Sequence, residues 1–228
     1  MDDRTDDLEN ARARLLTAAL PHVIFDGWTA PTFDAAARDA GIAPGLARVI
    51  CPRGALDLAV DYHRQGDRQM VEKLVASDLS ALKFREKVAR AVHLRLDLAD
   101  ADAVRRGVAL FALPQHMAQG SALLWGTADA IWRALGDNSA DVNWYTKRMT
   151  LSAVYSATVL YWLGDESEGR AESWAFLDRR IEDVMRFEKA KADFRASAPG
   201  RALAGPLKLL DGIRPPAPAP SDFPGQKG

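Results

Sequence analysis

The sequence predicts an all-α protein, and three observations support this prediction. Apolar residues recur at helical spacing along nearly the whole chain up to residue 196. No stretch shows the sustained apolar–polar alternation that is typical of a half-buried strand. Glycine and proline residues, which break regular structure, fall between the periodic segments. Hydrophobic residues make up 48% of the 228 residues, which is enough to bury a sizeable core.

The periodicity predicts helices that punctuating residues separate. The first is expected over 8–25, and Thr32 is predicted to cap a short second helix that Gly41 ends. A third short helix is expected over 43–51, before Pro52 and Gly54 interrupt the pattern and a longer helix begins. The remaining expected helices cover 82–98, 101–112, 115–135, 141–163 and 167–196.

Three regions follow from this pattern. Residues 1–55 are predicted to form a three-helix unit, because 35–56 shows the helix, glycine turn and short helix of a helix-turn-helix. Residues 56–197 are predicted to form a second helical domain, and that this domain binds a lipid is what the family resemblance described below implies. Residues 198–228 hold seven prolines and are expected to be a proline-rich tail.

Within the tail, 200–214 has the character of a short basic amphipathic helix. Such a segment typically lies on a membrane surface, although it could equally pack on the body of the protein or stay unordered. The residues expected to contact a membrane are Leu203, Leu207, Lys208, Leu210 and Ile213.

Composition excludes several classes of protein. The net charge of −1 gives no overall attraction to nucleic acid or anionic lipid. The single cysteine, Cys51, cannot form an intramolecular disulfide and fits a reducing compartment. No run of about 18 apolar residues is present. Because the first nine residues are rich in acids, unlike a targeting signal, a bacterial cytoplasmic protein, peripheral on the inner membrane, is expected.

The helix-turn-helix region lacks the positive charge of a DNA-binding domain. Residues 1–60 contain six arginines, no lysine and nine acidic residues, for a net charge of −3. Non-specific DNA affinity comes mainly from lysine and arginine side chains that neutralise phosphates. We therefore expect no nucleic-acid partner, and we interpret the helix-turn-helix as a structural element.

Motifs for catalysis are missing from the sequence. None of the four histidines has an acidic residue three positions before it, so no Glu-x-x-His pair of a di-iron bundle exists. Zinc, nucleotide and serine-nucleophile motifs are also missing, and we predict no catalytic residue, metal or cofactor. Asp137 and Asp141 beside Lys147 and Arg148 have the chemistry for acid–base work, but a helix cap and a salt-bridged face are the simpler interpretation.

The 115–135 helix carries two stripes. Leu124 and Ile131 belong to an apolar stripe expected to face the core. Asp129 and Trp132 belong to a second stripe rotated by about 100°. A tryptophan at the edge of the core with a polar rim is typical of a partner site, but it can also simply pack against the next helix.

The 141–163 helix alternates bulky aromatic residues with small ones. This pattern allows a cavity for an apolar ligand, and it equally allows close packing. The residues expected to line a lipid cavity are Leu124, Ile131, Trp144, Tyr145, Leu151 and Tyr155.

The segment 35–56 resembles the N-terminal domain of TetR-type transcriptional regulators. Those regulators usually carry a tyrosine in the recognition helix and a lysine shortly after it, both of which contact DNA phosphates. Here Arg48 and the Arg53–Gly54 region stand at the matching positions. The resemblance implies a TetR-type fold, which usually pairs through its last two helices, so a homodimer is expected. A ligand-responsive TetR-type repressor is the alternative function.

A second and more specific resemblance covers about 10–195. The motif G-D-x-S-x-D-x-N-W-Y-T-x-R at 136–148 follows a helix that ends in D-A-I-W-R. Further matching segments are 15–29, 109–114 and 174–183. Together they resemble the coenzyme Q (ubiquinone) biosynthesis accessory family, a lipid-binding family built around the ninth-numbered coenzyme Q protein.

That resemblance implies a function without catalysis. Family members bind lipids in the C-terminal domain and assist the di-iron demethoxyubiquinone hydroxylase, to which they are thought to present a prenylated quinone. The implied partners are therefore a lipid or prenylated quinone, the hydroxylase and a membrane surface. The residues that match the hydroxylase-binding patch are Leu123, Asp129, Trp132 and Arg133, of which Arg133 stands where the family often has an aromatic residue.

Overall fold

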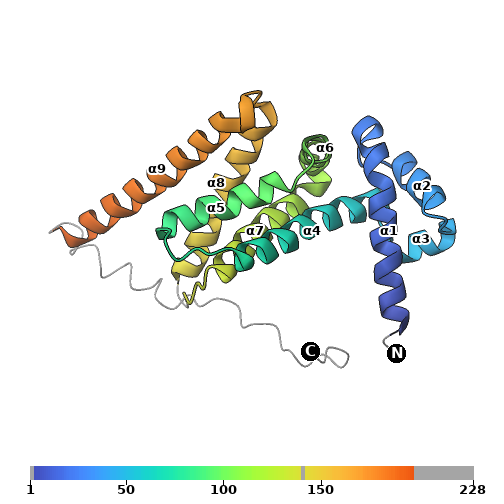
Figure 1. Cartoon of the computed structure of the whole chain (residues 1–228), viewed down its shortest axis with the longest axis horizontal. Helices are drawn as coiled ribbons and strands as arrows, with labels where there is room; N and C mark the ends of the chain where they lie inside the picture. The colour runs from blue at the N-terminus through green and yellow to red at the C-terminus, as the bar shows by residue number, and fades with distance from the viewer. Residues whose placement is uncertain (1–2, 140–141, 198–228) are drawn as a thin grey trace.

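The computed structural model describes residues 3–139 and 142–197, and every regular element in these two ranges is helical (Figure 1). The all-α prediction is confirmed. The elements are α1 (Asp3–Asp26), α2 (Ala30–Asp39), α3 (Pro44–Ile50), α4 (Ala55–Ala76), α5 (Phe84–Asp97), α6 (Ala101–Phe111), the 3₁₀ turn η1 (Pro114–His116), α7 (Met117–Ala134), α8 (Val142–Gly164), the 3₁₀ turn η2 (Glu168–Arg170) and α9 (Ala171–Ala196).

The N-terminal unit consists of α1, α2 and α3, with α2 and α3 packed against α1. Gly27 and Gly41 follow α1 and α2 with φ of 69° and 64°, a left-handed conformation that glycine adopts without strain. The predicted cap of the second helix was wrong by one turn. Thr29 is the N-cap, and its side chain accepts a hydrogen bond from the Thr32 amide. Thr32 instead donates from its hydroxyl to the Gly27 carbonyl at 2.7 Å.

Helix α4 joins the N-terminal unit to the C-terminal helices, as Figure 1 shows. Its first turns belong to the N-terminal core, where Leu58 and Ala59 pack with Leu15, and Ala103 of α6 also joins this core. The later part of α4 belongs to a second core that includes Met70. The expected division at residue 55/56 therefore falls at the first turn of a helix that both cores share.

The C-terminal helices form a bundle in which neighbours in sequence are mostly neighbours in space. Helix α4 packs on α5 and α7, α7 packs on α8, and α8 packs on α9, while α6 contacts both α1 and α7. Fully buried side chains of this core include Leu96, Ile131 and Leu177. Among the described residues, no helix is both long and apolar enough to cross a bilayer.

Two expectations fall on positions outside the described residues. Asp141, the expected cap of α8, is one of them. The expected membrane segment 200–214 is the other, and its five proposed contact residues lie there as well.

Candidate functional site

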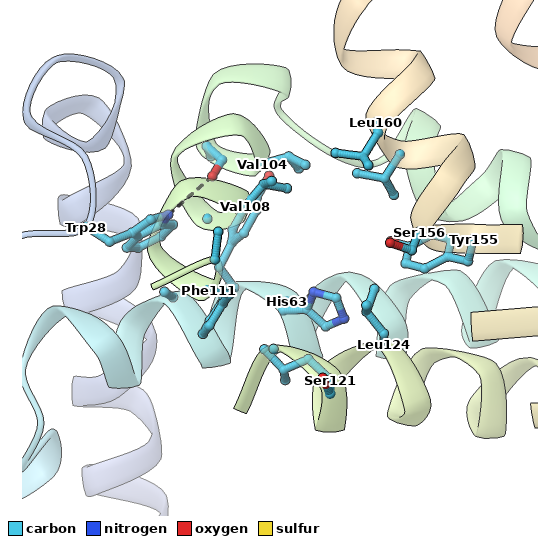
Figure 2. Close-up of a pocket in the computed structure, with 18 of the residues that line it drawn as sticks. Trp28, His63, Val104, Val108, Phe111, Ser121, Leu124, Tyr155, Ser156 and Leu160 are labelled. Carbon is cyan, nitrogen blue, oxygen red and sulfur yellow. Dashed lines mark hydrogen bonds between the residues drawn. The ribbon is translucent and has the colours of Figure 1, made fainter. Parts of the chain in front are cut away.

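A cavity of about 270 Å³ lies between the start of the C-terminal bundle and the N-terminal unit (Figure 2). Its walls come mainly from α4, α6, α7 and α8, with one residue from α5, and Trp28 reaches it from the segment between α1 and α2. The exposed side chains of Met117 and Leu160 line one part of it, so the cavity opens to solvent there. Most of the wall is apolar, with contributions from Val104, Val108 and Phe111.

One part of the wall is polar. His63 of α4 and Arg95 of α5 both line the cavity. Behind them, Arg95 donates from Nε to Asp67 at 2.7 Å and from Nη2 to the His63 carbonyl at 3.0 Å. Thr127 of α7 lies 2.8 Å from His63 Nε2 and 3.0 Å from Asp67 Oδ1, both measured from its hydroxyl oxygen. A buried ion pair and two hydrogen-bonding side chains thus form one connected group.

Burial controls the protonation of His63. It lowers the pKa of the imidazole from 6.5 to about 4, and this effect outweighs the opposing attraction of Asp67. His63 is therefore neutral at physiological pH, so it can accept one hydrogen bond and donate another. Burial also raises the pKa of Tyr155, which lines the same cavity, so its phenol stays protonated.

Gly66 makes room for the buried guanidinium. Arg95 is only 3% exposed and packs directly on α4 at this glycine. A Cβ atom added at Gly66 would lie 2.6 Å from Arg95 Cζ, which is closer than two carbon atoms can approach. The glycine inside α4 is therefore required by the close approach of the Arg95 side chain.

Helix α6 connects the cavity to the N-terminal unit. The Trp28 indole, which lines the cavity, donates from Nε1 to the Ala103 carbonyl at 3.2 Å (Figure 2). Arg106 donates to the carbonyls of Ile24 and Phe25, each at 3.0 Å, and so caps the end of α1. The cavity wall and the helix-turn-helix unit are thereby joined at three points.

The residues expected to line a lipid cavity separate into two groups. Leu124 and Tyr155 line this cavity. Ile131 is fully buried in the second core, and Leu151 faces a different groove. Trp144 and Tyr145 pack edge to face against each other, and both rings also contact Trp125 at a tilted angle. The three residues of α8 face elsewhere because this helix is buried on most of its circumference and only part of that surface meets the cavity. Ile131 belongs to α7, where it faces the core instead of the cavity.

The expected partner patch is only partly at the surface. Leu123 is 5% exposed and lines the cavity, so placing it in a surface patch was wrong. Trp132 stacks on Phe84 of α5, with ring centroids 5.4 Å apart, and donates from Nε1 to the Lys147 carbonyl at 3.2 Å. Arg133 has a side chain that is 72% exposed and pairs with Asp129 at 2.8 Å.

Trp132 also lines a groove of about 270 Å³ between α5, α7, α8 and α9. The other apolar walls of this groove include Phe84, Val154 and Met185, and Phe84 and Met185 are more than half exposed. Trp132 therefore packs against neighbouring helices and also lines an open apolar groove, while its role as a partner site stays a prediction.

The acidic and basic residues of the 136–148 motif form an ion-pair network. Arg148 is 1% exposed, and its guanidinium pairs with Asp129 at 2.6 Å and with Asp137 at 3.1 Å. It also lies over the Trp144 ring, 4.0 Å from the centroid. Hydrogen bonds from Lys147, Ser139 and Arg148 lower the pKa of Asp137 to about 2, although burial of this carboxylate acts to raise it. A carboxylate held ionised between two cations fixes a loop and is a poor proton acceptor.

Sequence reasoning missed the polar part of the cavity wall. His63 and Asp67 stand four residues apart, which places them on one face of α4, and this spacing was the available signal. Arg95 and Thr127 reach the same point from two other helices, which no local pattern shows. Among residues 3–139 and 142–197, no group of three His, Cys, Asp or Glu residues has the geometry to hold a metal ion.

The fold places the chain in the class of helical proteins with a TetR-type architecture. It is similar to the structure of a TetR transcriptional regulator from Nitrosomonas europaea, with a TM-score of 0.61 over 75% of this chain and 95% of that one, at 18% identity. Residues 117–188 match the COQ9 family model, and a relative from Drosophila melanogaster is 31% identical over 183 residues. The chain belongs to the COQ9 family.

The Drosophila relative is named ubiquinone biosynthesis protein COQ9, mitochondrial, and the match covers 78% of this chain and 56% of that protein. The human protein of the same name is 28% identical over 186 residues, covering 78% of this chain and 58% of its own length. A protein from Dictyostelium discoideum, named probable ubiquinone biosynthesis protein coq9, mitochondrial, is 29% identical over 190 residues, 80% of this chain and 62% of that one. The chain thus spans less than two thirds of these relatives.

The comparisons correct one expectation. A bacterial cytoplasmic location was predicted from the acidic first residues, but these relatives are all named as mitochondrial proteins. The prediction was wrong because a short acidic stretch does not identify a cellular compartment. It shows only that these few residues are not themselves a basic targeting signal.

Proposed function

We propose that this protein is a non-catalytic, lipid-binding accessory protein of ubiquinone biosynthesis. It binds a prenylated quinone intermediate or a membrane lipid and presents it to the di-iron demethoxyubiquinone hydroxylase. The observation that carries this proposal is the apolar cavity between α4, α6, α7 and α8 in a chain whose relatives are named ubiquinone biosynthesis proteins.

The cavity suits part of such a lipid. Its volume of about 270 Å³ is close to the lower end of the range for small-molecule sites, roughly 300–1,000 Å³. Its walls are mainly apolar, and each methylene group transferred from water to such a wall contributes about 0.8 kcal/mol. The volume holds a ring or a short stretch of chain, so the remainder of a prenylated molecule leaves past Met117 and Leu160.

The surface around Trp132 supports a protein partner. The groove beside it joins exposed apolar side chains of α5 and α9, and charged residues such as Arg85 and Lys147 also line it. An aromatic anchor with an apolar centre and a charged rim is the usual composition of an interface hot spot. We assign Asp129, Trp132 and Arg133 to the hydroxylase contact.

Two further contacts belong to the proposal. Exposed apolar side chains on the last two described helices support a homodimer in which α8 and α9 pair; these are Met149, Leu160, Tyr161, Met185 and Phe187. Contact with a membrane surface is assigned to the 200–214 segment because of its basic amphipathic sequence.

The direct test is extraction of the purified protein with organic solvent, followed by mass spectrometry. We expect an isoprenoid quinone or a phospholipid at near-stoichiometric amount. Ser121→Trp should block the cavity and lower the recovered lipid at least several-fold, because Ser121 lines it. Ala122→Trp is the matched control, since Ala122 is also exposed on α7 but does not line the cavity. A lipid-free wild-type protein, or equal recovery from both variants, would contradict the proposal.

A further inference from the structure

His63 is the polar group best placed to meet a ligand. Its side chain projects from α4 into the cavity beside Leu124 and Ser121 (Figure 2). It keeps 18% of its accessible surface, although the residues around it belong to the interior. An imidazole that is held away from bulk solvent and still faces an empty space is available for a hydrogen bond with whatever fills that space.

The contacts of Thr127 determine which ring nitrogen of His63 carries the proton. The Thr127 hydroxyl oxygen lies 3.0 and 3.1 Å from the two carboxylate oxygens of Asp67. The Leu123 carbonyl oxygen also lies 3.2 Å from this hydroxyl oxygen. Carboxylate and carbonyl oxygens only accept, so the single hydroxyl proton of Thr127 points to one of these acceptors. Thr127 must then accept from His63, and Nε2 is the protonated nitrogen at 2.8 Å. The Asp67 carboxylate 3.7 Å from Nε2 favours the same tautomer.

This tautomer leaves Nδ1 of His63 without a proton. A neutral imidazole whose Nε2 donates to the protein offers Nδ1 only as an acceptor. The group that meets it must therefore be a donor, such as a hydroxyl. A carbonyl oxygen at that point would face the lone pair of Nδ1 and leave both acceptors unsatisfied, which is costly in a buried site.

The charge of the polar wall selects an uncharged ligand head. Arg95 is paired with Asp67 at 2.7 Å, and its side chain is 4% exposed. The guanidinium charge is therefore neutralised inside the protein before any ligand arrives. An anionic head such as a phosphate would have to lose its hydration without gaining a free cation from Arg95, which is unfavourable in a site of low polarity.

The position of the opening sets the orientation of the ligand. Met117 and Leu160 are 56% and 58% exposed, whereas Arg95 and Tyr155 on the polar wall are each 3% exposed. An apolar chain that entered first would bury its end against His63 and Arg95 and gain no hydrogen bond. A ring that enters first satisfies His63 and leaves its chain among the apolar side chains at the opening.

We infer that the cavity binds the reduced, hydroxyl-bearing form of a prenylated ring in preference to its oxidised quinone form, because Nδ1 of His63 accepts a hydrogen bond from a ring hydroxyl. The inference rests on the proposed function, since it assigns the redox form and orientation of the ligand that the cavity holds. His63 is the specificity residue, and Thr127 and Asp67 position it by fixing its tautomer.

The test is calorimetric titration of the full chain, without oxygen, with ubiquinone that carries one isoprene unit and separately with its quinol. One hydrogen bond to a neutral acceptor should make the quinol bind roughly three- to tenfold more tightly than the quinone. The quinol whose two hydroxyls are methylated should lose this advantage, because it keeps the ring and the chain but cannot donate. This third probe needs no variant, so it works even if substitutions at His63 harm folding.

His63→Gln separates recognition from structure. A glutamine amide can still donate to Thr127 in place of Nε2, but it offers no acceptor at the position of Nδ1. The variant should bind quinol and quinone with equal affinity. His22→Gln is the matched control, because His22 pairs with Asp39 at the surface of the N-terminal unit, and it should keep the full preference.

The outcomes distinguish the inference from the function on which it rests. Equal binding of quinol and quinone by the wild type, or a preference that survives in His63→Gln, would overturn the inference and leave the lipid-binding function standing. Failure of the wild type to bind either form would overturn both. The inference would be established if the preference for quinol over quinone disappeared with the methylated quinol and in His63→Gln, and remained in His22→Gln.

Discussion

The guanidinium of Arg148 lies 3.1 Å from the carboxylate of Asp137, and the two side chains are 1% and 3% exposed. The same guanidinium pairs with Asp129 at 2.6 Å. Arg148 therefore joins the end of α7, the following loop and the first turns of α8 through one buried cation. Because the groove beside Trp132 is built on these segments, the ion pairs fix the surface that we assign to the hydroxylase.

Arg148→Ala should destabilise the protein by about 3 kcal/mol or more, since it leaves two carboxylates without their buried partner. Urea denaturation followed by circular dichroism measures this change. Arg133→Ala is the control, because Arg133 pairs with the same Asp129 but its side chain is 72% exposed, so the loss should stay within about 1 kcal/mol. Similar losses in the two variants would contradict the structural role of burial at Arg148.

Much of this fold could be predicted from the sequence because helices are local. The spacing of apolar residues predicted α3 over 43–51, and the helix spans Pro44–Ile50. The cap of α2 was misplaced because Thr29 and Thr32 are both suitable residues, and only the backbone path decides between them. The resemblance to the family was carried by a long motif, and the comparisons confirm it.

The candidate site was less predictable because it depends on which helices meet. Leu123 and Leu124 are adjacent in sequence, and both line the cavity, although one was expected at the surface. The ion pair of Arg95 with Asp67 joins residues 28 positions apart. Spacing within one helix identifies a buried face, but it does not identify the helix or the empty space that this face meets.

Gly66→Ala should destabilise the protein by about 1–3 kcal/mol, because the added Cβ lies 2.6 Å from Arg95 Cζ and displaces the guanidinium from Asp67. Thermal or urea denaturation measures the loss. Gly126→Ala on α7 is the matched control, since nothing lies within 4 Å of its added Cβ. There the substitution should be neutral or stabilise by about 0.5–1 kcal/mol through helix propensity. A stable Gly66→Ala protein would show that the space beside Arg95 is not limiting.

The stability of the protein should fall as pH decreases from about 6.5 to about 4. The folded state holds the pKa of His63 at about 4, below the ordinary 6.5 of the unfolded chain. The unfolded state therefore binds a proton first on acidification, which favours unfolding by up to about 3 kcal/mol, and the effect levels off below both values. Urea denaturation at a series of pH values measures this dependence.

The contribution of His63 is isolated by difference. Burial also lowers the pKa of His93, so the wild type shows a combined slope of the same sign. His63→Gln should reduce the slope between pH 6.5 and 4 without changing the loss below pH 3.8. That loss comes from Asp137, whose pKa the folded state holds at about 2, so the unfolded chain binds the proton first. An unchanged slope in the variant would mean that the folded state does not lower the pKa of His63.

Trp132→Ala should weaken binding of the hydroxylase by tenfold or more, since a buried aromatic anchor typically contributes at least 1.4 kcal/mol to an interface. Co-purification and surface plasmon resonance measure the change. Trp174→Ala is the matched control, because Trp174 is also half-buried and stacks on His93 away from the groove. A circular dichroism spectrum like that of the wild type confirms folding. Equal hydroxylase binding by the wild type and Trp132→Ala would remove the patch assignment.

The helix-turn-helix unit should bind duplex DNA weakly and with little dependence on salt. Three of its six arginines are already engaged: Arg12 pairs with Asp61, Arg53 pairs with Asp57 at 2.6 Å, and Arg14 donates to the Ala40 carbonyl. In α3, where a DNA reader presents its recognition residues, Val49 is 70% exposed.

Fluorescence anisotropy with a labelled duplex, from 50 to 200 mM salt, measures this property. A DNA-binding protein that neutralises 6–10 phosphates loses about 10³–10⁵ in affinity between 50 and 200 mM salt. With a net charge of −3 over residues 1–60, we expect a change below about tenfold. A steep loss of affinity with salt would show that the arginines leave their carboxylates for phosphates, and it would restore the transcriptional repressor as the better account of this fold.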